Sequence, residues 1–312
     1  MPATLPQVPA IANVIGASGI AHHLALLRNG RLHDLSAAAD PRLRTLDSLM
    51  KLPRDLARGL LEDPGLESLR GPDPSQVEWA APVGSQEVWG AGVTYLRSRE
   101  ARMEEAQVKD IYARVYEAER PELFFKAAGW RVVPHGQAVG ARSDSDWNVP
   151  EPELAVLSNF RGEVIAYSCG NDMSSRSIEA LNPLYLPQAK VYDGSCSIGP
   201  VAVLAWHVRA GALKLRMTIT RGGHRMFGGE AQTSGMVRDP SELTQVLHSA
   251  YTLPVGAWLL TGTGVVPPED YSAQPGDIIE ITIDSIGTLR NQVVRVGHTE
   301  AAARPRLPTG HR

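Results

Sequence analysis

The chain has 312 residues, of which 43% are hydrophobic and 21% are charged, and its formal net charge is −3. This composition is typical of a globular protein, and the absence of a basic cluster argues against nucleic acid as the main partner. No segment approaches the run of about 18 apolar residues that spans a bilayer. Met1-Pro2-Ala3-Thr4 lacks the charged start of a signal peptide. We therefore expect a cytoplasmic protein that acts on small molecules without a membrane partner.

Several common kinds of site have no support in the sequence. Cys169 and Cys196 are the only cysteines and form no C-x-x-C pair, which excludes a disulfide framework and a structural zinc site and predicts two buried thiols. The chain also contains no G-x-G-x-x-G, Walker lysine, H-E-x-x-H or G-x-S-x-G motif. Nucleotide binding, zinc proteolysis and serine hydrolysis are thus not indicated.

The first part of the chain differs in pattern from the rest. Residues 14–35 alternate around Asn29-Gly30, a pair typical of a tight hairpin. Residues 46–62 have helical spacing that Pro53 must interrupt. A stretch rich in Gly, Pro, Asp and Ser at 66–77 predicts a linker. We therefore expect a small α+β N-terminal domain at 1–76, a catalytic domain at 77–300 and a flexible tail at 301–312.

The pattern of the larger part changes from helix to strand. Residues 98–119 are charged and helical in spacing, which is typical of a surface helix or a lid. Beyond residue 149, short strand patterns alternate with Gly and Pro turns, and the last lie at 275–283 and 287–291. The expected fold class is therefore mixed α/β with a β-rich core.

Three carboxylates form the strongest candidate site. Glu151 and Glu153 stand two apart in Glu151-Pro152-Glu153, so an extended chain turns both to one face. A predicted hairpin, 154–157 and 163–167 around a turn at 158–162, would return Asp172 to the pair. Hard oxygen ligands favour Mg²⁺, Mn²⁺ or Ca²⁺ over zinc.

The alternative is that the two glutamates lie on a solvated strand face. Two details of this region lead to further expectations. Pro152 lacks an N–H, which predicts a strand that is short or at a sheet edge. Asn171 is expected to orient a polar turn that presents Asp172, without binding the metal itself. The glycine-rich run 261–264 is either a cradle for an anionic group of the substrate or a plain turn.

Short motifs follow one another in a particular order and spacing over residues 83–297. They are Gly92-Val93-Thr94-Tyr95, Phe125-Lys126, Glu151-Pro152-Glu153, Gly170-Asn171-Asp172 with Arg176, Lys190 before Tyr192-Asp193, Ile198-Gly199-Pro200, Thr261-Gly262-Thr263, Pro275-Gly276-Asp277 and Gly287 to Asn291. Taken together, these motifs resemble the fumarylacetoacetate hydrolase family. The resemblance implies a β-sandwich or β-roll core, a homodimer or dimer-based tetramer, and Mg²⁺ held by Glu151, Glu153 and Asp172 against a 2-oxo acid.

One departure from the family pattern bears on the reaction. Hydrolases of the family carry a histidine just after the tyrosine turn, where Ser98 stands in this chain. The segments 119–126 and 182–190 instead resemble the dehydratase branch, which converts a 2-keto-3-deoxypentonate to 2,5-dioxopentanoate. An acylpyruvate hydrolase and a non-catalytic oxo-acid-binding protein remain the alternatives.

The resemblance also assigns candidate roles around the metal. Glu122 and Lys190 are the candidate acid and base, in either order, because burial shifts the pKa of such groups toward neutrality. Arg97, Ser98, Lys126 and Thr261 are candidate substrate contacts. Arg120 and Arg176 are candidate partners for carboxylates, since a guanidinium binds them in a bidentate manner.

Overall fold

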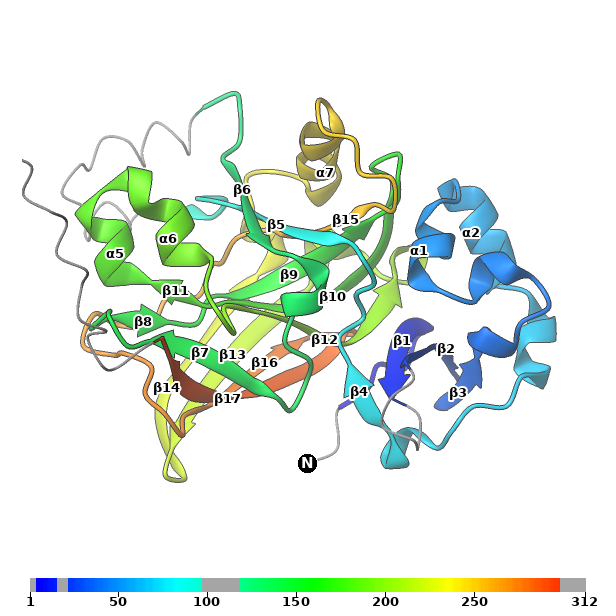
Figure 1. Ribbon diagram of the computed structural model, residues 1–312, viewed down its shortest axis with the longest axis horizontal. Helices are drawn as coiled ribbons and strands as arrows, with labels where there is room; N and C mark the ends of the chain where they lie inside the picture. Colours follow the sequence, from blue (N-terminus) through cyan, green and yellow to red (C-terminus); the bar gives the residue numbers. More distant parts are fainter. Residues whose placement is uncertain (1–3, 16–21, 97–117, 298–312) are drawn as a thin grey trace, which may run out of the picture.

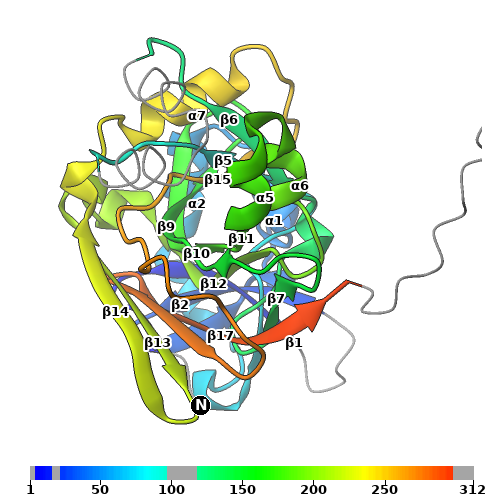
Figure 2. The same cartoon turned by 90° about the vertical axis from the view of Figure 1, so that its left-hand side faces the viewer.

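The computed structural model describes residues 4–15, 22–96 and 118–297. Two β-sheets lie against each other and form the body of the molecule, and helices cover the outer side of the larger one (Figures 1 and 2). The lid expected at 98–119 falls almost wholly outside the described residues, and the tail at 301–312 falls entirely outside them.

The larger sheet has ten strands in the order β3-β2-β1-β12-β10-β9-β15-β5-β6, with β4 paired to β1 beside this path. Neighbours are antiparallel except β15 and β5, which are parallel. The strands are β1 (Ala10–Ile15), β2 (His22–Arg28), β3 (Arg31–Asp34), β4 (Glu78–Ala80), β5 (Glu87–Ala91), β6 (Leu123–Ala127), β9 (Pro152–Ser158), β10 (Val164–Asp172), β12 (Cys196–Leu204) and β15 (Ala257–Leu260).

The smaller sheet has five strands in the order β14-β13-β16-β17-β7. Its strands are β7 (Ala138–Arg142), β13 (Lys214–Arg221), β14 (His224–Gln232), β16 (Ile278–Ile283) and β17 (Gly287–Val296). A two-stranded ribbon joins β8 (Asn148–Val149) to β11 (Ser174–Ser175). The described helices of the α type are α1 (Leu46–Met50), α2 (Arg54–Leu61), α5 (Arg176–Leu181), α6 (Leu186–Lys190) and α7 (Pro240–His248).

Side-chain alternation divides the apolar core into two layers. In β9, Leu154 and Val156 pack between the sheets with Leu215, Ile281 and other residues of the smaller sheet. Ala155 and Leu157 point the other way, into a cluster that includes the buried residues of α1 and α2. The larger sheet is therefore covered on both faces, whereas β13 and β16 alternate between buried and half-buried residues.

The N-terminal elements follow the sequence prediction. Asn29 and Gly30 both have positive φ, at 52° and 73°, and close the hairpin of β2 and β3 as a two-residue turn. Pro53 stands at the N-cap of α2 and separates it from α1, since proline cannot donate within a helix. These strands hydrogen-bond to β12 through β1. The boundary at residue 76 stays a prediction.

The expectation that Pro152 marks an edge strand is wrong. β9 pairs with β10 on one side and with β15 on the other, and all seven of its residues are buried. Pro152 is tolerated because it is the first residue of the strand, and the pairing with β15 extends only as far as Ala155.

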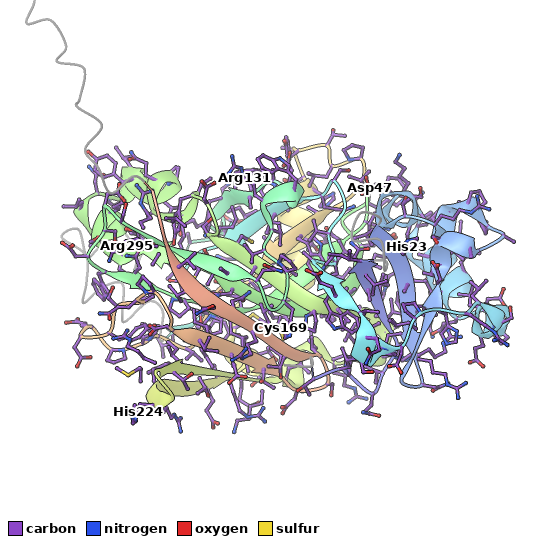
Figure 3. The ribbon with its side chains drawn as sticks, turned by 60° about the horizontal axis from the view of Figure 1, so that its bottom comes forward. His23, Asp47, Arg131, Cys169, His224 and Arg295 are labelled. Atoms are coloured by element: carbon purple, nitrogen blue, oxygen red, sulfur yellow. The ribbon has the colours of Figure 1, made fainter. Side chains whose placement is uncertain are left out.

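The two cysteines are buried thiols, as expected. Cys169 lies in the interior (Figure 3), where its thiol contacts the carbonyl of Gly287 on the smaller sheet. His224, by contrast, lies at the β13–β14 turn at the edge of the molecule (Figure 3). Burial raises the pKa of the Cys169 thiol to about 12, so this thiol stays protonated at neutral pH. No helix among the described residues is long and apolar enough to cross a membrane.

A buried carboxylate fixes the start of β16. Asp277 is fully buried and accepts two hydrogen bonds from Arg221, at 2.6 and 2.9 Å, and one from the Tyr271 hydroxyl at 3.0 Å. The backbone N–H of Gln274 also donates to it at 3.1 Å. This set of donors holds the loop before β16 against β13.

We expect Asp277→Ala to lower the free energy of unfolding by about 2–4 kcal/mol, because it leaves Tyr271 and Gln274 without their acceptor and Arg221 without its counter-ion. Urea denaturation followed by fluorescence measures this change. Asp270→Ala, at an exposed aspartate of the same loop, is the control and should stay within about 0.5 kcal/mol of wild type. Equal stability of the two variants would contradict this account of the loop.

Candidate metal and oxo-acid site

The three predicted carboxylates meet where β9 and β10 begin and end. Glu151 and Asp172 exchange backbone hydrogen bonds, at 2.9 and 3.2 Å, and Glu153 lies opposite Gly170 in the same antiparallel pair. Alternation then places all three side chains on one face of the sheet. Their ligand oxygens all lie within 4.8 Å of one another, and each residue is at most 3% exposed.

Asp172 reaches this position from a strand and not from a turn, which corrects the role expected for Asn171. β10 runs through Asp172, paired with β12 as well as β9. Asn171 points to the opposite face, is fully buried, and has no hydrogen-bond partner for its side chain among the described residues. A residue larger than Gly170 would require Leu260 to move, because a Cβ there would meet Leu260 Cδ2 at 2.5 Å.

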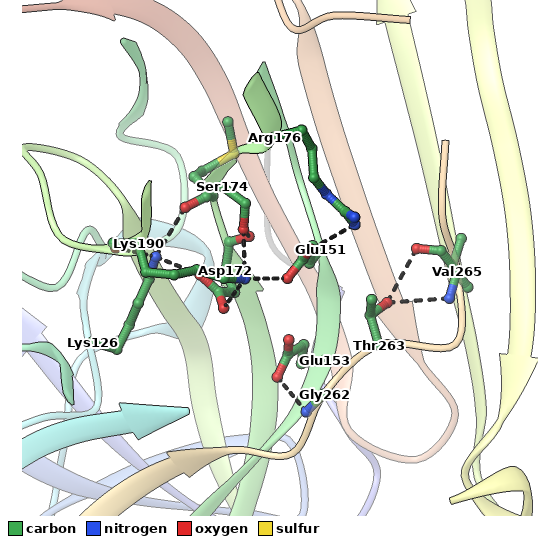
Figure 4. A network of polar contacts seen from close by, with 11 residues as sticks. Lys126, Glu151, Glu153, Asp172, Ser174, Arg176, Lys190, Gly262, Thr263 and Val265 are labelled. Atoms are coloured by element: carbon green, nitrogen blue, oxygen red, sulfur yellow. Dashed lines mark hydrogen bonds and ion pairs between the residues drawn. The ribbon is translucent and has the colours of Figure 1, made fainter. Parts of the chain in front are cut away.

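Three buried cations surround the carboxylates (Figure 4). Lys190 Nζ donates to Glu151 Oε2 at 2.5 Å, Asp172 Oδ2 at 2.9 Å and the Ser174 hydroxyl at 2.7 Å. These acceptors use the three N–H groups of an ammonium. Arg176 Nη2 donates to Glu151 Oε1 at 2.7 Å. The cluster is thus an ion network that excludes bulk water.

Lys126 is the third buried cation of this network. Its ammonium pairs with Asp172 and donates to the backbone carbonyls of Met173, at 2.9 Å, and Lys190, at 2.5 Å. The side chain is fully buried. In this structure Lys126 therefore contacts protein groups and holds Asp172 to the end of α6, and its contact with substrate stays a prediction.

Glu153 differs from the other two carboxylates in its surroundings. The backbone N–H of Gly262 donates to its Oε2 at 2.6 Å. Burial, followed by the charges of Asp172 and Glu151, raises the pKa of Glu153 well above its usual range. Burial, followed by the charge of Glu153, raises the pKa of the neighbouring Tyr95 hydroxyl. The glycine-rich run 261–264 therefore serves a carboxylate of the protein, which neither expectation for it included.

The residues present fit a hard divalent cation. Three carboxylates offer converging oxygens, the donor set that Mg²⁺ prefers. A cation among them would attract the ionised form of Glu153 and so offset the repulsion that raises its pKa.

Two further carboxylates approach the same place. Glu122, just before β6, and Glu179, on α5, line a cavity of about 20 Å³ together with Glu153, Asp172, Lys190 and other residues. This volume holds about one water molecule, so a metal ion and a small acid require the lining side chains to move apart. Glu179 was missed from sequence because six residues of α5 are too few to show a helical period.

The remaining candidates are placed less centrally. Thr261 is fully buried and donates its hydroxyl to the carbonyl of Leu154 at 2.9 Å, so its contact with substrate stays a prediction. Arg120 is exposed. Arg97 and Ser98 lie outside the described residues.

The model of the fumarylacetoacetate (FAA) hydrolase C-terminal domain matches residues 87–294. The chain belongs to the fumarylacetoacetate hydrolase family. This membership confirms the resemblance, and the mixed, strand-rich fold that it implied is confirmed as well.

Two relatives within the family are named as dehydratases. A protein of Haloferax volcanii named as a probable 2-keto-3-deoxyxylonate dehydratase is 44% identical over 283 residues, which cover 88% of this chain and 96% of that protein. The 2-dehydro-3-deoxy-D-arabinonate dehydratase of Saccharolobus solfataricus is 45% identical over 213 residues, 67% of this chain and 72% of that one.

A solved structure extends the comparison to the fold. It is described as 2-keto-3-deoxy-D-arabinonate dehydratase complexed with magnesium and 2,5-dioxopentanoate. It superimposes with a TM-score of 0.77 at 33% identity and covers 92% of this chain and 99% of that one.

We expect Glu151→Gln to weaken binding of Mn²⁺, used as a probe for the site, by about 10²-fold or more, because one of three anionic ligands is lost. Isothermal titration calorimetry measures the affinity, and circular dichroism checks that the variant is folded. Glu269→Gln, at an exposed glutamate, is the matched control. Unchanged affinity in the Glu151 variant would show that the metal binds elsewhere.

Proposed function

We propose that this protein is a metal-dependent hydro-lyase that converts a 2-keto-3-deoxypentonate to 2,5-dioxopentanoate and water. The observation that carries this proposal is the buried triad of Glu151, Glu153 and Asp172, with Lys190 and Glu122 beside the same cavity. Two relatives at 44% and 45% identity are named dehydratases of such acids, and a solved structure that superimposes with a TM-score of 0.77 is described as such a dehydratase complexed with magnesium and 2,5-dioxopentanoate. Mg²⁺ is therefore the proposed cofactor.

The chemistry of the substrate explains why these groups are needed. The ketone at C2 acidifies the hydrogens on C3, and removal of one of them precedes loss of the C4 hydroxyl. A bound divalent cation supplies positive charge that stabilises negative charge on a keto oxygen. Arg176 and Lys190 hold the carboxylates that would bind the cation. They also exclude water from the cluster by burial.

The contacts of Lys190 support one order of acid and base. A general base must have a free electron pair, whereas Lys190 donates to three acceptors and is held as an ammonium. Glu122 lines the cavity and is half-buried. We therefore assign Glu122 as the base at C3 and Lys190 as the acid that protonates the departing C4 hydroxyl.

Two alternatives are less well supported. An acylpyruvate hydrolase needs a base that activates water, and the chain has no histidine between Tyr95 and His135. A non-catalytic protein that only binds an oxo acid would not need Glu122 and Lys190 at the metal. Assembly as a homodimer or dimer-based tetramer, a cytoplasmic location and a role in pentose catabolism are further proposals, supported by the family to which the chain belongs.

We expect the purified protein with Mg²⁺ to convert a 2-keto-3-deoxypentonate into a product lighter by one water, and to leave an acylpyruvate unchanged. Mass spectrometry of both incubations decides between the reactions. Release of pyruvate from the acylpyruvate would establish the hydrolase instead. No turnover of pentonates of either C4 configuration, by protein that binds Mn²⁺, would support the non-catalytic alternative.

Gly92 provides a test of Glu122 that leaves its carboxylate in the chain. A Cβ at Gly92 would overlap the Glu122 carboxylate, the far end of a flexible side chain that can move. We expect Gly92→Ala to lower kcat by about 10²-fold, in the direction of Glu122→Gln, and to leave Mn²⁺ affinity unchanged. Gly211→Ala is the control, because a Cβ there meets nothing within 4 Å. Wild-type kcat in Gly92→Ala would argue against Glu122 as the base.

A further inference from the structure

The proposed reaction, on which this inference rests, requires more proton transfers than dehydration alone. Loss of a C3 proton and the C4 hydroxyl yields 5-hydroxy-2-oxopent-3-enoate, with a double bond between C3 and C4. 2,5-Dioxopentanoate is an isomer of that compound, with an aldehyde at C5 and methylene groups at C3 and C4. One hydrogen must leave C5, and one must arrive at each of C3 and C4. Glu122 and Lys190 carry out the elimination, and the transfer of a proton from C5 to C4 needs a further group.

Glu179 is placed to serve these later transfers. It lies three residues after Arg176 on α5, so both side chains share one face of the helix, and both are buried, at 4% and 2% exposed. Arg176 reaches Glu151, which brings this face of α5 to the metal carboxylates. Glu179 then lines the cavity together with Glu122, Lys190 and two of the predicted metal ligands.

Glu179 is one of four carboxylates that line this cavity, together with Glu122, Glu153 and Asp172. An apolar side chain would bury the same face of α5 without bringing a polar group to the cavity. A carboxylate beside the proposed reaction site suits a group that accepts and returns protons.

We propose that Glu179 is a second proton-transfer carboxylate that moves a proton from C5 to C4. Glu179 removes one C5 proton from the enone; the electron pair forms the C4–C5 double bond, the C3–C4 pair shifts to C2–C3, and negative charge passes to the keto oxygen. Glu122 returns to C3 the proton that it took there, which restores the ketone. The enol that remains spans C4 and C5.

The last step closes the proton balance. Glu179 delivers its proton to C4, the C5 hydroxyl becomes the aldehyde, and the hydroxyl proton passes through water to Lys190. That proton replaces the one that Lys190 gave to the departing hydroxyl. The net change is loss of one water, with one C5 hydrogen transferred to C4.

The experiment uses a 2-keto-3-deoxypentonate carrying two deuterium atoms at C5, incubated with the Mg²⁺-loaded protein in ordinary water. We expect wild type to give 2,5-dioxopentanoate with one deuterium at C5 and deuterium at C4, since Glu179 is shielded from solvent exchange. Glu179→Gln should still lose water but release 5-hydroxy-2-oxopent-3-enoate, and the rate of 2,5-dioxopentanoate formation should fall by about 10²-fold or more. NMR locates the deuterium, and Glu269→Gln should match wild type.

The possible results separate this inference from the proposed function. Deuterium absent from C4 in the wild-type product would overturn the transfer, whatever the variant does. Wild-type kinetics and labelling in Glu179→Gln would exclude Glu179, and so would a folded Glu179→Gln variant that no longer removes water. If wild type consumes no pentonate at all, the proposed function itself fails.

Discussion

The structure depends on keeping three carboxylates close together and away from water. Glu151, Glu153 and Asp172 are almost completely buried with their oxygens within 4.8 Å of one another, an arrangement that repulsion would break without compensation. Lys126, Lys190 and Arg176 supply it as buried cations, each of which contacts at least one carboxylate. Because Glu122 and Glu179 add two carboxylates beside the same cavity, the described residues around the cluster have an excess of negative groups. A divalent cation is the natural complement of that excess.

The two sheets make this arrangement possible. β9 and β10 are central strands, so their backbone positions are fixed by hydrogen bonds on both sides. The opposite face of the same strands packs against the smaller sheet through Leu154, Val156 and Cys169. The ligands are thus held by strands whose opposite face is packed into the core, whereas α5 and α6 bring Arg176, Glu179 and Lys190 from outside the sheet. Strands β9 and β10 hold the carboxylates, and helices α5 and α6 bring the groups that would act on substrate.

Much of this could be predicted from sequence, for identifiable reasons. The spacing of Glu151 and Glu153 predicted one face because a strand has a period of two, and the hairpin pattern predicted the return of Asp172. Pro152 was misread as an edge residue because sequence does not show where β15 stops pairing. The targets of Lys126 and the use of Gly262 by Glu153 depend on contacts between residues far apart in the chain. Glu179 lies on a helix of six residues, too short for a period to appear.

The packing of β9 has a consequence for how this protein can change over time. A shift of β9 by one residue would turn both glutamates into the apolar layer between the sheets and bring Leu154 and Val156 to the metal side. Any change that preserves this packing therefore preserves the face to which positions 151 and 153 point. Arg176 and Lys190 contact the carboxylates, but the chain between them exposes Leu181 and Leu184 and takes no part there in either apolar layer. Insertions and substitutions around residues 181–184 therefore leave the register of β9, and with it the direction of the two glutamates, unchanged.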